Sequence, residues 1–266
     1  MSEQSISNRI LGAGKESLRH LGPLKGIFAG CQLSSPPTFR QSTDDIKRAI
    51  ELDILPLSDV PGEDRRASVL EQLNGGIRIA AAAAQDMKHF SHRDTPLSED
   101  QLAASHLYSQ ETDAERNIAS VYSLLNAALR SEDRNKVKAF KNFIWLYMTA
   151  LRLSPKTESK VLHRGVRADL SAQYEKDRIV TWHQFSSCTT AVEVLENPMF
   201  LGTSGARTIL SVELKSNSSA RDVSSFSSMQ ENEVMLPPNT RVQVMFKFFL
   251  KYNRGSLAEI CCVRRW

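Results

Sequence analysis

The spacing of hydrophobic positions along the chain changes near residue 160, and this change predicts two kinds of structure. From residue 43 onward, apolar residues recur every three or four positions, which is the period of an amphipathic helix. After residue 160 the apolar runs become short, β-branched and aromatic, and turn-forming residues separate them, which is typical of strands. Helices followed by strands predict an α+β fold, with an N-terminal helical lobe and an antiparallel β-sandwich core.

Five segments of the first half carry helix signals. Ser98 and Gln101 make a capping box ahead of one of them, and the segment 112–115 makes another. The pair Gly75-Gly76 interrupts the longest segment and is expected to kink or split it. The predicted helices cover residues 44–52, 65–89, 99–109, 112–129 and 137–151, and Ser154-Pro155 ends the last one.

Seven short segments of the second half carry strand signals. In one of them Val242, Val244 and Phe246 alternate with polar residues, as expected for a strand with one buried face. The connections are too short for repeated crossover helices, so we expect mostly antiparallel neighbours, about six or seven strands in two packed layers. The predicted strands are 161–166, 179–187, 208–214, 220–225, 233–236, 241–250 and 258–263.

Domain organisation follows from the same pattern. Residues 1–40 are polar, contain many glycines and lack a sustained period, so we expect a flexible lead-in there. Residues 41–266 are expected to form one domain, with the helical lobe at 41–157 and a β-rich core at 158–266. The 266 residues are 41% hydrophobic and 24% charged, which is ordinary for a globular domain of this size.

Charge and cysteine content exclude some functions. The 34 basic and 30 acidic residues are spread along the chain without a basic block, so nucleic acid is not an expected partner. The chain opens without an apolar leader and lacks the run of about eighteen apolar residues that spans a membrane. We therefore expect a cytoplasmic protein with no membrane partner, and export without a leader stays open. The cysteines, at Cys31, Cys188, Cys261 and Cys262, lack the spacing of a zinc site, so no metal is expected.

A serine-rich run leads into Glu231-Asn232-Glu233, which an apolar segment and Pro237-Pro238 follow. In an extended chain, side chains two residues apart share a face about 6 to 7 Å from each other, so Glu231 and Glu233 are expected to face one cleft. Two carboxylates that close can stabilise a cation and accept a proton when a glycosidic bond breaks. The alternative is a solvated turn that carries two glutamates by chance, and Glu-x-Glu alone does not decide between the two.

Other enzyme classes lack their signatures in this chain. Gly-x-Ser-x-Gly is absent and the six histidines form no recognisable set, which disfavours a Ser-His-Asp hydrolase. The chain also lacks the phosphate-binding Gly-x-x-x-x-Gly-Lys-Ser/Thr sequence and the glycine fingerprint of dinucleotide-binding folds. A nucleotide would therefore have to be held by a cleft between strands.

Three motifs stand out in the strand-rich half: Val161-Leu162-His163-Arg164-Gly165-Val166, Ser187-Cys188-Thr189, and the run from Glu231 to Pro238. They resemble motifs of the arginine-specific mono-ADP-ribosyltransferases, particularly the eukaryotic-type members. They are similar to the arginine, Ser-x-Ser/Thr and Glu-x-Glu motifs of the family, in that order, although Cys188 and Thr189 depart from Ser-Thr-Ser. The resemblance covers roughly residues 50 to 262 and implies the ADP-ribosyltransferase type of α+β fold.

The resemblance also implies roles for the catalytic residues. Arg164 would contact the NAD phosphates or the nearby ribose, because a guanidinium binds two oxygens at once. Ser187 would hydrogen-bond and orient Glu233, with Thr189 as a supporting group. Glu233 would stabilise the oxocarbenium-like cation that forms when nicotinamide leaves, and Glu231 would orient the acceptor arginine and take its proton.

Two further residues would bind NAD. The backbone of Gly165 would approach the nicotinamide carboxamide, which a residue without Cβ allows closely. Phe200 would stack on the nicotinamide ring, although a core aromatic is nearly as good an interpretation.

Together these roles imply that the protein transfers ADP-ribose from NAD to arginine side chains of a target protein and releases nicotinamide. NAD would be the substrate, and no metal would be needed. The expected partner is a protein that presents an exposed arginine. An NAD glycohydrolase and a catalytically silent NAD-binding module are the alternatives.

Overall fold

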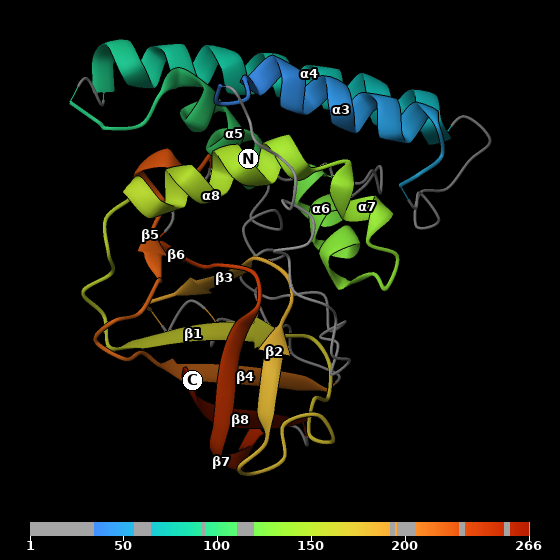
Figure 1. The fold of residues 1–266 in the computed structure, drawn as a ribbon. Coiled ribbons are helices and arrows are strands. Elements are labelled where there is room, and N and C mark those ends of the chain that lie inside the picture. The colour runs from blue at the N-terminus through green and yellow to red at the C-terminus, as the bar shows by residue number, and fades with distance from the viewer. Residues whose placement is uncertain are drawn as a thin grey trace. The chain divides into compact units, whose positions relative to one another are not determined.

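The computed structural model describes residues 35–55, 65–91, 94–110, 120–191, 195, 206–228, 232–252 and 256–265. These residues fall into two compact units. The helical unit contains the described residues of Gly22–Ser154 and Ser225–Gln230, and the strand unit contains those of Pro155–Ser224 and Glu231–Trp266. Helices followed by a mainly antiparallel sheet confirm the predicted α+β class (Figure 1).

The helical unit is organised around α5, which contacts α3, α4, α6 and α8 (Figure 1). Residues 101–109 of this helix are all buried, because four helices pack against it. The helices are α3 (Phe39–Glu51), α4 (Arg65–Asp86) with a π-helical turn η1 (Met87–Ser91), α5 (Glu99–Ser109), α6 (Val121–Arg130), α7 (Asn135–Lys138) and α8 (Lys141–Leu153).

Capping residues set where the helices begin. At α5 the predicted box is confirmed, since the Gln101 amide donates to Ser98 Oγ and the Ser98 amide donates to Gln101 Oε1. Thr38 and Gln41 make the same box at α3, which therefore begins at Phe39, ahead of the predicted start at residue 44. The box predicted at 112–115 lies outside the described residues, and α6 begins at Val121 after the N-cap Ser120.

The Gly75-Gly76 pair was expected to kink or split its helix, and it does not split it, because α4 continues through both residues. Gly76 lies where α4 and α5 approach closely. A Cβ atom added to Gly76 would lie 2.6 Å from Gln110 Oε1 and 3.3 Å from Leu107 Cδ1. The side-chain amide of Gln110, through Nε2, also donates a hydrogen bond to the Gly76 carbonyl at 3.1 Å. Packing against α5 therefore outweighs the low helix propensity of glycine at this position.

The strand unit is one eight-stranded sheet with the order β2-β7-β8-β4-β1-β3-β6-β5. All neighbours are antiparallel except β4 and β8. The prediction of six or seven strands is too low, because the predicted segment 179–187 divides into two strands. The strands are β1 (Val161–Val166), β2 (Ile179–Trp182), β3 (Ser186–Thr189), β4 (Arg207–Glu213), β5 (Arg221–Asp222), β6 (Glu233–Leu236), β7 (Thr240–Tyr252) and β8 (Ser256–Arg265), and η2 (Ser224–Phe226) follows β5.

The two halves of the sheet are joined at β1, which pairs with β4 over its whole length but with β3 only at His163 and Thr189. Side chains from both halves meet in one buried core, which includes Trp182 of β2, Cys188 of β3 and Val263 of β8. The two halves of the sheet therefore pack against a common core, as the two layers of a sandwich do. Unlike separate layers, they are joined by hydrogen bonds into one sheet.

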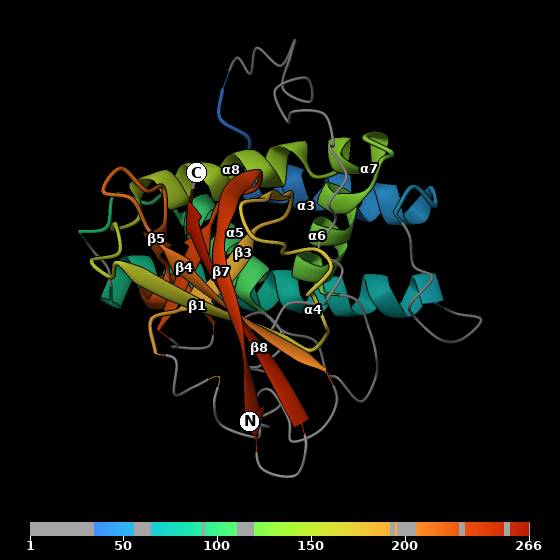
Figure 2. The ribbon, with the colours of Figure 1, turned by 90° about the horizontal axis from the view of Figure 1, so that it is seen from below.

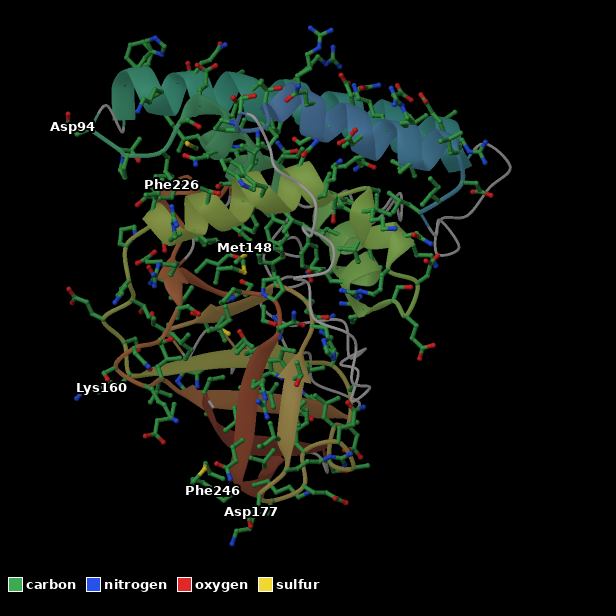
Figure 3. All side chains as sticks on the ribbon, viewed as in Figure 1. Asp94, Met148, Lys160, Asp177, Phe226 and Phe246 are labelled. Atoms are coloured by element: carbon green, nitrogen blue, oxygen red, sulfur yellow. The ribbon has the colours of Figure 1, made fainter. Side chains whose placement is uncertain are left out.

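The longest strands, β7 and β8, form a hairpin that Figure 2 shows side by side. A register shift between Val244 and Phe246 interrupts their pairing. Phe246 is 53% exposed and lies at the surface of β7 (Figure 3). The regular alternation predicted for this segment is therefore broken by the bulge between Val244 and Phe246.

The contact at Gly76 predicts opposite outcomes for two neighbouring substitutions. Gly75→Ala should raise the free energy of unfolding by about 0.5–1 kcal/mol, because no atom lies within 4 Å of the added methyl group and alanine favours the helix. Gly76→Ala should be less stable than Gly75→Ala by about 1–2 kcal/mol, because the methyl group displaces the Gln110 side chain from its hydrogen bond. Urea denaturation of both variants measures this difference, and equal stability would contradict the close approach.

Candidate active site

The central strand β1 carries Arg164, which is 1% exposed. Its guanidinium Nη1 donates a 2.7 Å hydrogen bond to the main-chain carbonyl of Ser187 on β3. Arginine supplies several donors on a long side chain, so it can reach the backbone of a neighbouring strand. Arg164 thereby fixes the main chain of the strand that carries the Ser-x-Ser/Thr motif.

The strands β3 and β6 place two motif side chains on the same face of the sheet. Thr189 lies opposite Glu233 in the pairing of β3 with β6, so their side chains share a face of the sheet. Side chains alternate between the two faces along a strand. Ser187 and Glu233 therefore point away from the core, whereas Cys188 and Val234 point into it. Ser187 Oγ donates a 2.6 Å hydrogen bond to Glu233 Oε1. The two residues are 3% and 1% exposed, so the bond lies in a water-poor environment.

The main chain of Glu233 is fixed as well as its carboxylate. Its amide donates to Ser224 Oγ at 3.1 Å, and its carbonyl accepts from the Val223 amide at 3.0 Å. No motif in the sequence points to Ser224. It lies in the serine-rich run nine positions before Glu233, and only the β5–β6 pairing identifies which serine of that run is the partner.

The structure brings together four of the predicted site residues, Arg164, Gly165, Ser187 and Glu233, on the adjacent strands β1, β3 and β6. The other two, Phe200 and Glu231, lie outside the described residues. A buried carboxylate that is held by a hydroxyl donor can stabilise a positive charge that develops beside it, because it is already oriented and poorly screened by water.

Features of other classes of site are missing from the part of the chain that the structure describes. They contain no group of three or more His, Cys, Asp or Glu side chains placed to hold a metal ion. Among the helices that the structure describes, each is too short or too polar to cross a membrane.

The sequence matches the family model of NAD:arginine ADP-ribosyltransferases over residues 59–253. This chain belongs to that family. Family membership makes NAD the substrate and ADP-ribose transfer the reaction. No protein with a curated function matches the sequence significantly.

Several solved structures share the ADP-ribosyltransferase fold with this chain. XopAI, a type III effector from Xanthomonas axonopodis pv. citri, is 18% identical, with a TM-score of 0.52 over 98% of this chain and 99% of its own. The eukaryotic mono-ADP-ribosyltransferase ART2.2 is 14% identical, with a TM-score of 0.52 over 85% of this chain and 87% of its own. The ADP-ribosyltransferase Vis, solved with agmatine, is 19% identical, with a TM-score of 0.50 over 71% of this chain and 85% of its own.

The Ser187–Glu233 hydrogen bond predicts the effect of Ser187→Ala. Loss of a hydrogen bond to a charged group costs about 1.5–3 kcal/mol, so NAD turnover should fall about 10- to 100-fold while the strand pairing persists. Nicotinamide release under saturating NAD measures this loss.

Ser186→Ala is the matched control on the same strand. The buried Ser186 hydroxyl makes no hydrogen bond within the described residues, so its removal should leave turnover unchanged and stability equal or slightly higher. Comparable turnover in Ser187→Ala and Ser186→Ala would remove the Ser187 hydroxyl from the active site.

Proposed function

We propose that this protein transfers ADP-ribose from NAD to the guanidinium of an arginine on a target protein. Family membership supports the ADP-ribose donor and the type of reaction. The observation that carries the proposal is the buried hydrogen bond from Ser187 to Glu233, the second glutamate of Glu-x-Glu. It holds one carboxylate in a defined orientation, as the chemistry of glycosidic cleavage requires.

In the first half of the proposed reaction, the bond between ribose C1′ and the nicotinamide nitrogen breaks. The bonding electrons leave with nicotinamide, which departs as a neutral molecule, and positive charge develops on the ribose. Glu233 lies on the same face of the sheet as Ser187, and its carboxylate would stabilise that charge. The negative charge of Glu233 matters most in the transition state, because the cation is absent before it and consumed after it.

In the second half, a nitrogen of the acceptor guanidinium forms the new bond to C1′. The guanidinium is protonated at any physiological pH, so it must lose a proton as it attacks. We assign the orientation of this cation and the acceptance of its proton to Glu231. The assignment rests on its spacing of two residues from Glu233 in the sequence.

The NAD-binding part of the proposal uses residues 158–266 as the β-rich core. Gly165 on β1 would let the nicotinamide carboxamide approach the backbone, and Phe200 would stack on the nicotinamide ring. Arg164 would act in two ways. It holds the Ser187 main chain, and we propose that it also contacts the NAD phosphates or the adjacent ribose.

The test of the proposed function is nicotinamide release with and without agmatine, a small molecule with a guanidinium group. Agmatine is a suitable acceptor because the related fold of Vis was solved with it. Release that agmatine accelerates, together with ADP-ribosylated agmatine as product, supports arginine transfer. Release that is indifferent to agmatine identifies an NAD glycohydrolase, and no release in either condition identifies a silent NAD-binding module.

We expect Arg164→Lys to weaken the use of NAD. The ammonium of lysine is a point charge that loses the planar, two-oxygen geometry of arginine, which is worth about 1.5–3 kcal/mol for one charged hydrogen bond. kcat/KM for NAD should therefore fall about 10- to 100-fold, as measured by steady-state kinetics. Arg167, an exposed arginine three residues later, provides the control as Arg167→Lys. Unchanged kinetics in Arg164→Lys would exclude Arg164 from the site.

The two glutamates are expected to differ. Glu233→Gln keeps the shape but removes the charge, so both transfer to agmatine and NAD hydrolysis should fall at least about a hundredfold. Glu231→Gln should depress transfer far more than hydrolysis, because water needs no carboxylate to orient a bulky cation. Parallel assays of both activities in both variants measure the split.

Two outcomes would contradict these assignments. Equal losses of transfer and hydrolysis in both variants would mean that the glutamates act as one unit. Full activity of Glu233→Gln would refute the proposed mechanism, since the carboxylate it requires would be absent.

A further inference from the structure

A side chain binds the main-chain amide of Glu233 where a regular sheet would use the main chain. The strands β5 and β6 are antiparallel, and their last paired residues are Asp222 and Val234. Val223 and Glu233 come next in this register, and the Val223 amide donates to the Glu233 carbonyl at 3.0 Å. In a regular antiparallel pair the two residues exchange both hydrogen bonds. Here Ser224 Oγ accepts from the Glu233 amide at 3.1 Å, so it supplies the acceptor that the Val223 carbonyl supplies in a regular pair.

The position of Ser224 explains why a hydroxyl is needed. The strand β5 is two residues long and the 3₁₀ turn η2 begins at Ser224, so the main chain leaves the sheet at the level of Glu233. Glu233 is 1% exposed, and a buried amide without an acceptor is costly. The Ser224 hydroxyl therefore keeps the first residue of β6 in the sheet after the neighbouring main chain has left it.

Asp222 holds Ser224 in turn. The Ser224 amide donates to Asp222 Oδ1 at 2.9 Å, and the Asp222 amide donates to the Pro155 carbonyl at 3.0 Å. Because β5 is the edge strand next to β6 (Figure 1), the contact with Pro155 supports its outer side. A series of hydrogen bonds thus runs from Pro155 through Asp222 and Ser224 to Glu233, and all four residues belong to the strand unit.

Glu233 is consequently held at two points that do different work. Ser187 donates to its carboxylate and sets the orientation of that group. Ser224 accepts from its amide and fixes the main chain from which the side chain projects. Catalysis depends steeply on such placement, since a displacement of about 1 Å can cost about a hundredfold in rate.

We propose that Ser224 and Asp222 are positioning residues for the Glu233 carboxylate in the cleavage of NAD. The proposal rests on the proposed function, in which this carboxylate stabilises the ribosyl cation. Ser224 acts on the Glu233 main chain directly, and Asp222 acts through Ser224. The negative charge matters most in the transition state, so loss of either side chain lowers kcat and leaves KM for NAD nearly unchanged.

The experiment measures nicotinamide release in variants of both residues. Ser224→Ala should lower kcat about 5- to 30-fold with KM for NAD within about twofold of wild type. Ser224→Thr keeps the hydroxyl and should retain about half or more of the wild-type kcat. Asp222→Ala should lower kcat about 3- to 10-fold, and Asp222→Asn, which keeps an acceptor oxygen, should recover most of that loss.

The strand unit offers a matched control for each residue. Ser218 is half-buried like Ser224, and its Oγ also accepts from a main-chain amide at 3.1 Å, that of Ala220. Asp169 Oδ1 accepts from the amide two residues later at 2.8 Å, as Asp222 Oδ1 does at 2.9 Å. Ser218→Ala and Asp169→Ala should keep wild-type turnover, and urea denaturation should show that they and the test variants are folded.

A second measurement tests whether Ser224 acts through the carboxylate. In a Glu233→Gln background, Ser224→Ala should lower the residual rate of nicotinamide release by less than about twofold, because no carboxylate is left to position. The same loss as in the wild-type background would mean that Ser224 acts on another group, and it would overturn the inference.

Two further outcomes would also overturn it. One is an unchanged kcat in Ser224→Ala, and the other is an equal loss of kcat in Ser218→Ala. Failure of the proposed function gives a different result, because Glu233→Gln would then release nicotinamide at the wild-type rate whatever the Ser224 variants do. The inference would fall with it.

Discussion

A carboxylate removed from water is the constraint around which the strand unit is built. Glu233 is 1% exposed, and a buried ionised carboxylate is costly unless charged or hydrogen-bonded groups compensate for its lost hydration. Ser187 provides a donor at 2.6 Å, and Arg164 fixes the main chain of Ser187. The order β1-β3-β6 is what makes this series of contacts possible, because it puts strands that are distant in the sequence next to one another.

Serine side chains do much of the positioning around Glu-x-Glu, and each does so through a different bond. Ser187 donates to a carboxylate, Ser224 accepts from a main-chain amide, and Ser228 donates to Ser109 twice, from its amide to the hydroxyl and from its hydroxyl to the carbonyl. A hydroxyl suits this task because it can act as donor and acceptor and occupies little space in a packed interior. The serine-rich composition of this region thus reflects specific contacts as well as a polar loop.

Local signals in the sequence were sufficient for much of the fold. The strands at 161–166 and 233–236 and the helix after Ser98 have the predicted bounds, because alternation and a capping box are encoded within a few residues. Features set by distant contacts were missed. The unbroken helix through Gly76 packs closely against α5 and Gln110, and sequence alone does not reveal those neighbours.

The same distinction applies to the candidate site. Short motifs identified Arg164, Ser187 and Glu233, whose contacts with one another the structure then supplied. Ser224 and Ser109 could not be singled out, because each acts through a partner on another element and many serines precede Glu-x-Glu. Residues that perform chemistry are constrained in type and spacing, whereas residues that position them are constrained by tertiary contacts.

The unusual cysteine in the Ser-x-Ser/Thr motif follows the same rule. Cys188 lies between Ser187 and Thr189, but strand alternation directs it to the opposite face, where it is fully buried in the hydrophobic core. The core requires a small apolar side chain there, and a cysteine satisfies that requirement as a small hydrophobe. On the face toward Glu233, the Ser187 hydroxyl donates to the Glu233 carboxylate, and the Thr189 hydroxyl accepts from the Ala191 amide. Strand alternation thus separates the two faces of β3, and the side chain at its middle position enters the core without facing Glu233.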